Sequence, residues 1–161
     1  MFRAAARLQE LVPDGVETGV RNLIRHRPLE VEEAEIAGQK LRVPTLAEMA
    51  RIKAWLCLMR NATRDYIDFA ALADRLGDRA AGAVVAAMDD YYGDQLGPGG
   101  ARVATQVAKQ LAEPCPYDLS AVDLATYRGL ERPWQNWENV SDGCRRVALE
   151  VLDHLVEGDP P

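Results

Sequence analysis

The sequence predicts a mainly α-helical fold, a multi-helix bundle with one small β-hairpin near residues 29–43. Apolar residues recur at the i, i+3, i+4 and i+7 spacing of amphipathic helices along most of the chain. Residues 29–43 differ, because two short extended segments flank a glycine there, and this is the only convincing strand signal. With 161 residues, 48% of them hydrophobic and 27% charged, the chain can bury a proper core.

Residues 1–43 are expected to form an N-terminal unit of two helices and the hairpin. Apolar positions at helical spacing predict helices over residues 2–12 and 16–27. The hairpin strands then flank Ala37-Gly38-Gln39, which places a glycine in the turn.

Residues 44–161 are expected to form a helical bundle that makes one compact unit with the N-terminal part. Thr45 and Glu48 have the spacing of a capping box, which predicts a helix over residues 45–60. Thr63 can cap the next helix. The expected elements that follow are a helix over 63–76, a third with an apolar stripe from Ala81 to Tyr92, a loop over 93–100, a helix over 101–111, a short helix over 121–127, and a long final helix with apolar positions from Cys144 to Leu155.

Charge and composition narrow the class of protein. The net charge is −6, with 19 Lys and Arg against 25 Asp and Glu, which argues against a dedicated nucleic-acid-binding surface. No apolar run is long enough to span a bilayer and the N-terminus lacks a signal-peptide pattern, so we expect a cytoplasmic protein without membrane contact. The three cysteines are expected to be reduced and at least half-buried.

One group of charges falls on apolar helix faces. Lys53 and Arg60 share a face with leucines and a methionine, and Asp65 shares one with Phe69, with Asp68 at its edge. A short corner between the two helices would bring these charges together. They can form a buried ion-pair cluster that fixes the angle between the two helices. Asp65 can also be present simply because the helix dipole favours an acid in the first turn. Alternatively, the charges are held for a phosphate or a metal ion.

The segment from Val43 to Phe69, with VPTLAE, then Lys53, then RNATRDYIDF in one-letter code, resembles the helical lobe of the abortive-infection (AbiEii-like) nucleotidyltransferase toxins. The resemblance implies that Lys53 and Asp65 are catalytic residues of a nucleotide site. It also implies that Arg60, Arg64 and Asp68 bind the nucleotide. The hairpin before this segment is compatible with the last strands that precede the lobe in that family.

The chain departs from the family pattern in its catalytic lobe. That lobe carries a Gly-Ser pair and an Asp-x-Asp that binds two magnesium ions. Here Ser120 and Ser141 are the only serines, neither follows a glycine, and the chain contains no Asp-x-Asp. We therefore assign no metal ligands and expect no cofactor in this chain alone. Magnesium and a nucleoside triphosphate would bind only if a catalytic lobe were supplied.

Two function hypotheses follow from these observations. In the first, the chain is the helical lobe of an AbiEii-like nucleotidyltransferase of the toxin–antitoxin or phage-defence type, inactive alone and separated from its catalytic lobe. In the alternative, it is a non-catalytic helical protein–protein interaction module. In either case we expect a protein partner or a second copy to cover the hairpin and the first helices.

Overall fold

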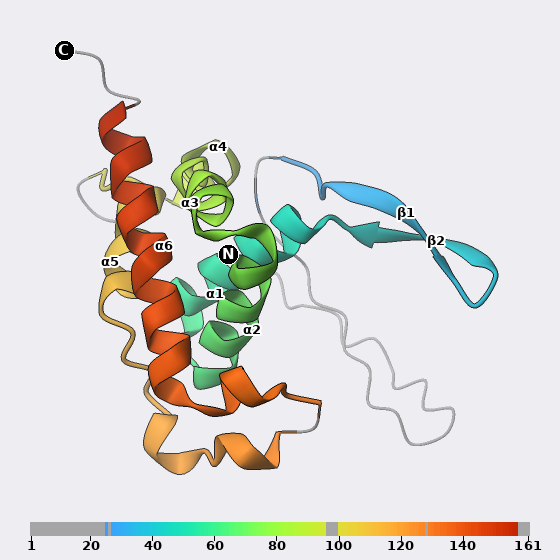
Figure 1. Cartoon of the computed structure of the whole chain (residues 1–161). Helices are drawn as coiled ribbons and strands as arrows, with labels where there is room; N and C mark the ends of the chain where they lie inside the picture. Colours follow the sequence, from blue (N-terminus) through green and yellow to red (C-terminus); the bar gives the residue numbers. More distant parts are fainter. Residues whose placement is uncertain (1–24, 26, 96–99, 128, 158–161) are drawn as a thin grey trace, which may run out of the picture.

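The computed structural model describes residues 25, 27–95, 100–127 and 129–157. The predicted mainly α-helical fold is confirmed: the helices pack into one bundle, and a two-stranded antiparallel hairpin extends away from it (Figure 1). The predicted helix over residues 2–12, and nearly all of the one over 16–27, lie outside the described residues. The division between residues 1–43 and 44–161 stays a prediction.

The hairpin pairs β1 (Val31–Ile36) with β2 (Gln39–Pro44). Its two-residue turn is formed by Ala37 and Gly38, whose φ angles are 52° and 76°. Both lie in the left-handed region that a tight hairpin turn requires, and glycine adopts it without strain. The glycine turn predicted from the sequence is therefore present, and the strand bounds agree with the expected ones to within two residues.

The first two helices are α1 (Leu46–Arg60) and α2 (Thr63–Leu76). The Thr45 side chain accepts a hydrogen bond from the Glu48 amide at 3.1 Å and caps α1, as predicted. The prediction that Thr63 caps α2 is wrong. Thr63 is already helical, and the Asp118 carboxylate accepts hydrogen bonds from its amide and its hydroxyl, both at 2.7 Å. The cap comes from a residue far along the chain.

The predicted third helix is interrupted. It divides into α3 (Asp78–Ala86) and the short α4 (Asp89–Tyr92), followed by η1 (Gly93–Gln95). Asp89 at the start of α4 accepts a hydrogen bond from the Val103 amide at 2.5 Å and caps α5. The chain thus bends after α3 and places a carboxylate at the N-terminus of another helix, where the exposed amides and the helix dipole favour it.

The rest of the chain forms one more interior helix, three 3₁₀ turns and the long final helix. The short helix predicted over residues 121–127 is wrong, because 3₁₀ turns occupy this stretch. The elements are α5 (Val103–Ala112), η2 (Leu119–Ala121), η3 (Leu124–Thr126), η4 (Arg132–Gln135) and α6 (Trp137–Glu157).

Helix α6 runs along the whole bundle and packs against α2, α3 and α5 (Figure 1). Its inward stripe, which includes Val140, Val147 and Val151, is fully buried in the common core. The crossing with α3 is so close that a Cβ on Gly82 would lie 2.5 Å from the Glu150 Cβ. None of the helices in the described part of the chain has the length and apolar character to cross a membrane.

Candidate functional site

The residues singled out from the sequence meet at the corner between α1 and α2. The Lys53 ammonium lies 2.7 Å from an Asp68 carboxylate oxygen and 3.5 Å from the Asp65 Oδ1. Arg60 Nε lies 3.6 Å from the Asp65 Oδ2, and Arg64 Nε lies 4.0 Å from Asp68. All five predicted site residues are therefore neighbours, and we call them the corner cluster.

The corner itself explains why these charges meet. Helix α1 ends at Asn61, which has φ 49° and ψ 38° in the left-handed region, and α2 begins two residues later. The Asn61 side chain accepts a hydrogen bond from the Tyr66 hydroxyl at 2.5 Å and one from Gln110 at 2.8 Å. Burial raises the pKa of Tyr66 to about 12, so this network holds a neutral phenol. The turn is thus fixed by uncharged hydrogen bonds.

Burial differs sharply within the corner cluster. The Asp65 side chain is 3% exposed, whereas those of Lys53, Arg60 and Arg64 are 27%, 47% and 74% exposed. The prediction that Lys53 and Arg60 lie on a buried face is therefore wrong in degree, although Asp65 is buried as expected. The reason is that this part of α1 packs through the small side chains of Ala50, Ala54 and Cys57, and Lys53 and Arg60 lie at the margin of the core.

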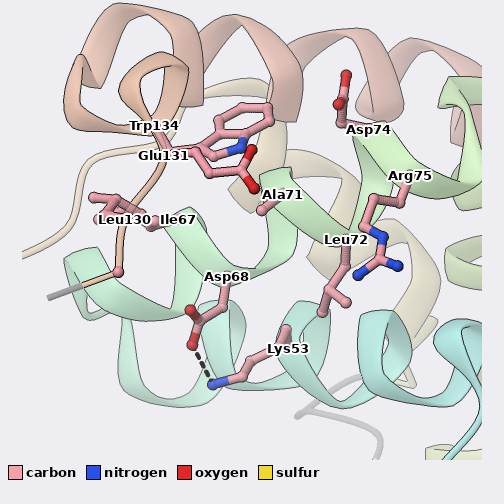
Figure 2. A pocket seen from close by; sticks show the side chains of 11 residues that line it. Lys53, Ile67, Asp68, Ala71, Leu72, Asp74, Arg75, Leu130, Glu131 and Trp134 are labelled. Carbon is pink, nitrogen blue, oxygen red and sulfur yellow. Dashed lines mark ion pairs between the residues drawn. The ribbon is translucent and has the colours of Figure 1, made fainter. Parts of the chain in front are cut away.

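The corner cluster borders a hollow of about 360 Å³ between α2 and residues 129–134 (Figure 2). A second hollow of about 270 Å³ continues past Arg64 and Tyr127. Lys53 lines the first hollow, Arg64 the second and Asp68 both, while Asp65 and Arg60 line neither. The first hollow has an apolar lining of Ile67, Ala71, Leu72, Leu130 and Trp134 and a charged one of Lys53, Asp68, Asp74, Arg75 and Glu131.

The charges of the corner cluster largely neutralise one another, with three cations sharing the two carboxylates of Asp65 and Asp68. Each cation lies within 4 Å of a carboxylate of α2, and Asp68 contacts both Lys53 and Arg64. A phosphate would have to displace these carboxylates from the cations, which lowers its binding energy. In the part of the chain described, no group of three or more His, Cys, Asp or Glu side chains is arranged to hold a metal ion.

The cysteines offer no reactive thiol in the core. Cys57 and Cys144 are buried, and burial raises both pKa values, that of Cys144 to about 12. Both thiols therefore stay protonated at neutral pH and are poor nucleophiles. Cys115 is exposed, which contradicts the prediction that every cysteine is at least half-buried.

Sequence reasoning missed a second charged group, which we call the base cluster because it joins the base of the hairpin to the bundle. Its centre is the carboxylate of Glu48, which is 0% exposed and forms ion pairs with Arg25 and Arg51. Arg51 also lies 3.3 Å from Glu30, which precedes β1. The spacing of Thr45 and Glu48 predicts a capping box, in which the Glu48 carboxylate would accept a hydrogen bond from the Thr45 amide. The Thr45 amide instead donates to the Glu30 carbonyl, at 3.0 Å.

Tyr91 of α4 completes the base cluster. The Arg51 guanidinium lies 3.7 Å from the centre of its ring, and those of Arg25 and Arg27 lie 5.2 Å and 5.1 Å from it. The Tyr91 hydroxyl donates a hydrogen bond to the Glu30 carboxylate. This bond lowers the pKa of Glu30 and raises that of Tyr91. The cluster thus ties the chain before β1 to α1 and α4.

Comparison with known proteins links the chain to transport proteins. It is 37% identical over 134 residues, 80% of its length, to "Heme uptake protein MmpL11" of Mycobacterium tuberculosis and to "Probable transport protein MmpL11" of Mycobacterium bovis. It is 35% identical over 130 residues to "Mycolic acid-containing lipids exporter MmpL11" of Mycolicibacterium smegmatis. The match spans only 13% of each relative. No protein-family model matches the chain, and no solved structure does.

These relatives overturn three predictions. The resemblance to AbiEii-like nucleotidyltransferases is wrong, because proteins matching 80% of the chain are transport, uptake and export proteins. The prediction that the chain is a nucleotidyltransferase lobe of a toxin–antitoxin or phage-defence system is therefore also wrong. The comparisons give no support to the alternative, a stand-alone interaction module. A cytoplasmic location is wrong on the same ground. The nucleotide-site roles assigned to Lys53 and Asp65 stay untested and have lost the resemblance that implied them.

Proposed function

We propose that this chain acts as a helical accessory domain in a transport system of the kind represented by the MmpL11 proteins. One observation carries the proposal: 35–37% identity over 80% of the chain to transport, uptake and export proteins. The match spans 13% of those proteins, so the proposal concerns one part of a transporter and not its whole activity.

The form of the domain fits this role. The described helices pack around their own core, with α6 covering α2, α3 and α5, and none of them has the character of a membrane span. Such a unit carries out its task beside the membrane-spanning part of a transporter. The corner cluster and the base cluster then serve as rigid corners that fix the orientation of the helices and of the hairpin.

The hairpin is the surface that best suits contact with the rest of a transporter. It extends away from the bundle (Figure 1), and Ile36 and Leu41 are 53% and 45% exposed. In the pairing register Ala34 lies opposite Leu41, so one face of the arm is largely apolar. The other face carries Glu33 opposite Arg42 and Glu35 opposite Lys40. An apolar face on a charged arm is typical of a contact surface.

A domain exchange tests the proposal. In a Mycolicibacterium smegmatis strain lacking its own lipids exporter, three versions of that exporter are compared: intact, with the segment matched here deleted, and with that segment replaced by this chain. We expect the replacement to restore export of mycolic acid-containing lipids well above the deletion, at equal protein abundance. Export at the level of the deletion would contradict the proposal, as would full export by the deletion itself.

A variant of the exchanged chain tests the hairpin. Ile36→Glu with Leu41→Glu places two charges on the apolar face of the arm without touching the core. We expect this variant to lose most of the restored export. The control is Glu33→Gln with Glu35→Gln on the opposite face, which should keep it. Equal export by both variants would remove the hairpin from the proposal but leave the domain assignment intact.

A further inference from the structure

The hollow between α2 and residues 129–134 is lined by a buried hydrogen-bond donor that has no acceptor in the described part of the chain. Trp134 is only 9% exposed, so about nine-tenths of it is buried. Its indole N–H forms no hydrogen bond with a described residue and points into the hollow (Figure 2). Indole N–H groups at buried positions usually find a partner. This N–H therefore offers a hydrogen bond to a molecule that occupies the hollow.

A hydrogen-bond acceptor lies next to this donor. Glu131 is the N-cap of η4, and the Trp134 amide donates to its carbonyl at 3.0 Å. Side chains three residues apart in a 3₁₀ turn are nearly eclipsed, so these two leave the same side of the turn. Figure 2 shows both pointing toward Ala71 of α2. Glu131 forms no ion pair with a described residue, so its carboxylate is available to a ligand.

The surface beside this donor and acceptor is apolar. Ile67, Ala71 and Leu72 of α2 line it together with Leu130. The volume of about 360 Å³ lies at the lower end of the range of roughly 300–1,000 Å³ that is typical of small-molecule sites. Such sites combine an apolar wall with a few polar groups that fix the orientation of the ligand. The hollow has both features.

We propose that this hollow binds a small amphiphilic alcohol, with its apolar body on α2 and its hydroxyl between Trp134 and Glu131. The hydroxyl oxygen accepts a hydrogen bond from the indole N–H, and its hydrogen is donated to the Glu131 carboxylate. A carboxylate in the same place would accept from the indole but would meet the negative charge of Glu131. An ammonium group would donate to Glu131 but has no lone pair for the indole N–H.

The cations of the hollow offer a competing position for the polar group of a ligand. Lys53 is held by Asp68 at 2.7 Å, whereas Arg75 forms no ion pair with a described residue. A ligand with a carboxylate would place it beside Arg75 and leave the Trp134 indole without an acceptor. The two positions of the polar group are therefore distinguished by the indole N–H signal and by variants of Glu131 and Arg75.

Titration of octanol into the full ¹⁵N-labelled chain, followed by nuclear magnetic resonance, tests the proposal. We expect the indole proton signal of Trp134, identified by its loss in Trp134→Phe, to move downfield and to saturate with a dissociation constant of about a millimolar or below. The indole signals of Trp55 and Trp137, which contact Tyr92 and Tyr66 and do not line the hollow, should stay in place. An unmoved Trp134 signal would overturn the proposal.

Octanoate, with the same alkyl chain and a charged head, tests the choice of a hydroxyl. It should bind at least about fivefold more weakly than octanol, because Glu131 repels it. Glu131→Gln should make octanoate bind about fivefold more tightly and change octanol binding by less than about twofold, since the amide oxygen still accepts. Arg75→Gln should leave octanol binding unchanged. Octanoate that binds as tightly as octanol, or octanol binding that depends on Arg75, would place the polar group elsewhere and contradict the proposal.

Two further variants test the donor and the cavity by calorimetry. Trp134→Phe keeps an aromatic ring without the N–H and should weaken octanol binding about two- to tenfold, the loss of one hydrogen bond. Ala71→Phe fills the hollow and should abolish binding, whereas Ala80→Phe, at an exposed position of α3, should not. Undiminished binding by Ala71→Phe would exclude the hollow as the site. Circular dichroism checks the fold of each variant, and export in the domain exchange reports separately on the proposed function.

Discussion

The Glu48 carboxylate should be among the most sensitive charged positions in the protein. It has no exposed surface, and the Arg25 and Arg51 side chains that pair with it are 2% and 5% exposed. The change Glu48→Gln keeps the shape of the side chain but leaves two buried cations without their central anion. Breaking a buried pair by removing one partner costs about 3–5 kcal/mol. We expect the free energy of unfolding to fall by that amount.

Such a loss is a large part of the roughly 5–15 kcal/mol that stabilises a domain. The assay is therefore chemical denaturation followed by circular dichroism at low temperature. The control is Glu33→Gln, because Glu33 is 70% exposed and its ion pair within the described residues is with exposed Lys40. The control should change the free energy of unfolding by less than about 0.5 kcal/mol.

A double variant separates the loss of the ion pair from general damage. In Glu48→Gln with Arg51→Met, one of the stranded cations is also removed, so part of the lost stability should return relative to Glu48→Gln alone. We expect a coupling of about 1–3 kcal/mol between the two changes. A loss below about 1 kcal/mol for Glu48→Gln, or strictly additive effects, would refute the argument that the base cluster depends on this carboxylate.

Two further changes probe helix packing and capping. Gly82→Ala should destabilise by about 1–3 kcal/mol, since its Cβ would meet the Glu150 Cβ, whereas Gly143→Ala, with its nearest neighbour at 3.6 Å, should be neutral or stabilising in thermal denaturation. Asp118→Asn should cost about 0.5–2 kcal/mol at neutral pH. Burial alone would raise the pKa of Asp118, but hydrogen bonds from Thr63 lower it, so this contribution is present above the ordinary carboxyl pKa and lost as the pH falls through the lowered value. Asp118→Asn should therefore flatten acid unfolding below about pH 4, and an unchanged acid profile would contradict this role.

The fold could be predicted where it depends on local sequence patterns. It could not be predicted where it depends on contacts between distant parts of the chain. The hairpin turn, the Thr45 cap and the corner cluster could be predicted because each depends on residues close in sequence. The base cluster could not, because Arg25, Glu48 and Tyr91 come from distant parts of the chain. The spacing of Thr45 and Glu48 fits a capping box equally well whether the glutamate turns back to the helix start or into the interior.

The interruptions in the helices have the same origin. The apolar periodicity from Ala81 to Tyr92 continues through the break between α3 and α4, so the pattern gives no sign of it. The break places Asp89 where it can cap α5, a partner fourteen residues away. Likewise, the acid that caps α2 lies 55 residues beyond Thr63. Helix propensity and apolar periodicity describe one segment of the chain at a time. These caps connect two segments, so neither property predicts them.

The comparisons overturned the function prediction, and the motif behind it was chemically ambiguous. A lysine and an aspartate at a helix corner can serve a nucleotide site or neutralise each other, and the short motif around Arg64 and Asp65 fits both. The structure brings Lys53 to 2.7 Å from Asp68 and 3.5 Å from Asp65, so each cation already has an anion. The absence of the Gly-Ser pair and of Asp-x-Asp from the sequence was the stronger signal.

The corner cluster makes a prediction that depends on its uneven burial. The Asp65 side chain is 3% exposed and that of Lys53 is 27% exposed. Removing the Lys53 cation therefore takes a partner from a buried carboxylate. Removing the Asp65 carboxylate leaves a lysine that still contacts Asp68. Lys53→Met should therefore destabilise by about 2–3 kcal/mol, lessened by Arg60 at 3.6 Å, and Asp65→Asn by about 1 kcal/mol or less.

The two changes together should cost less than their sum, with a coupling of about 1–2 kcal/mol that persists at high salt because the contact is largely shielded from solvent. Urea denaturation of the single and double variants at low and high salt measures these quantities. The reverse order, with Asp65→Asn the costlier change, would mean that the carboxylate stabilises the fold through bonds other than the one to Lys53. A coupling of about 0.2–1 kcal/mol that disappears with salt would instead describe a solvated surface contact, and the corner would then be fixed by the Asn61 network alone.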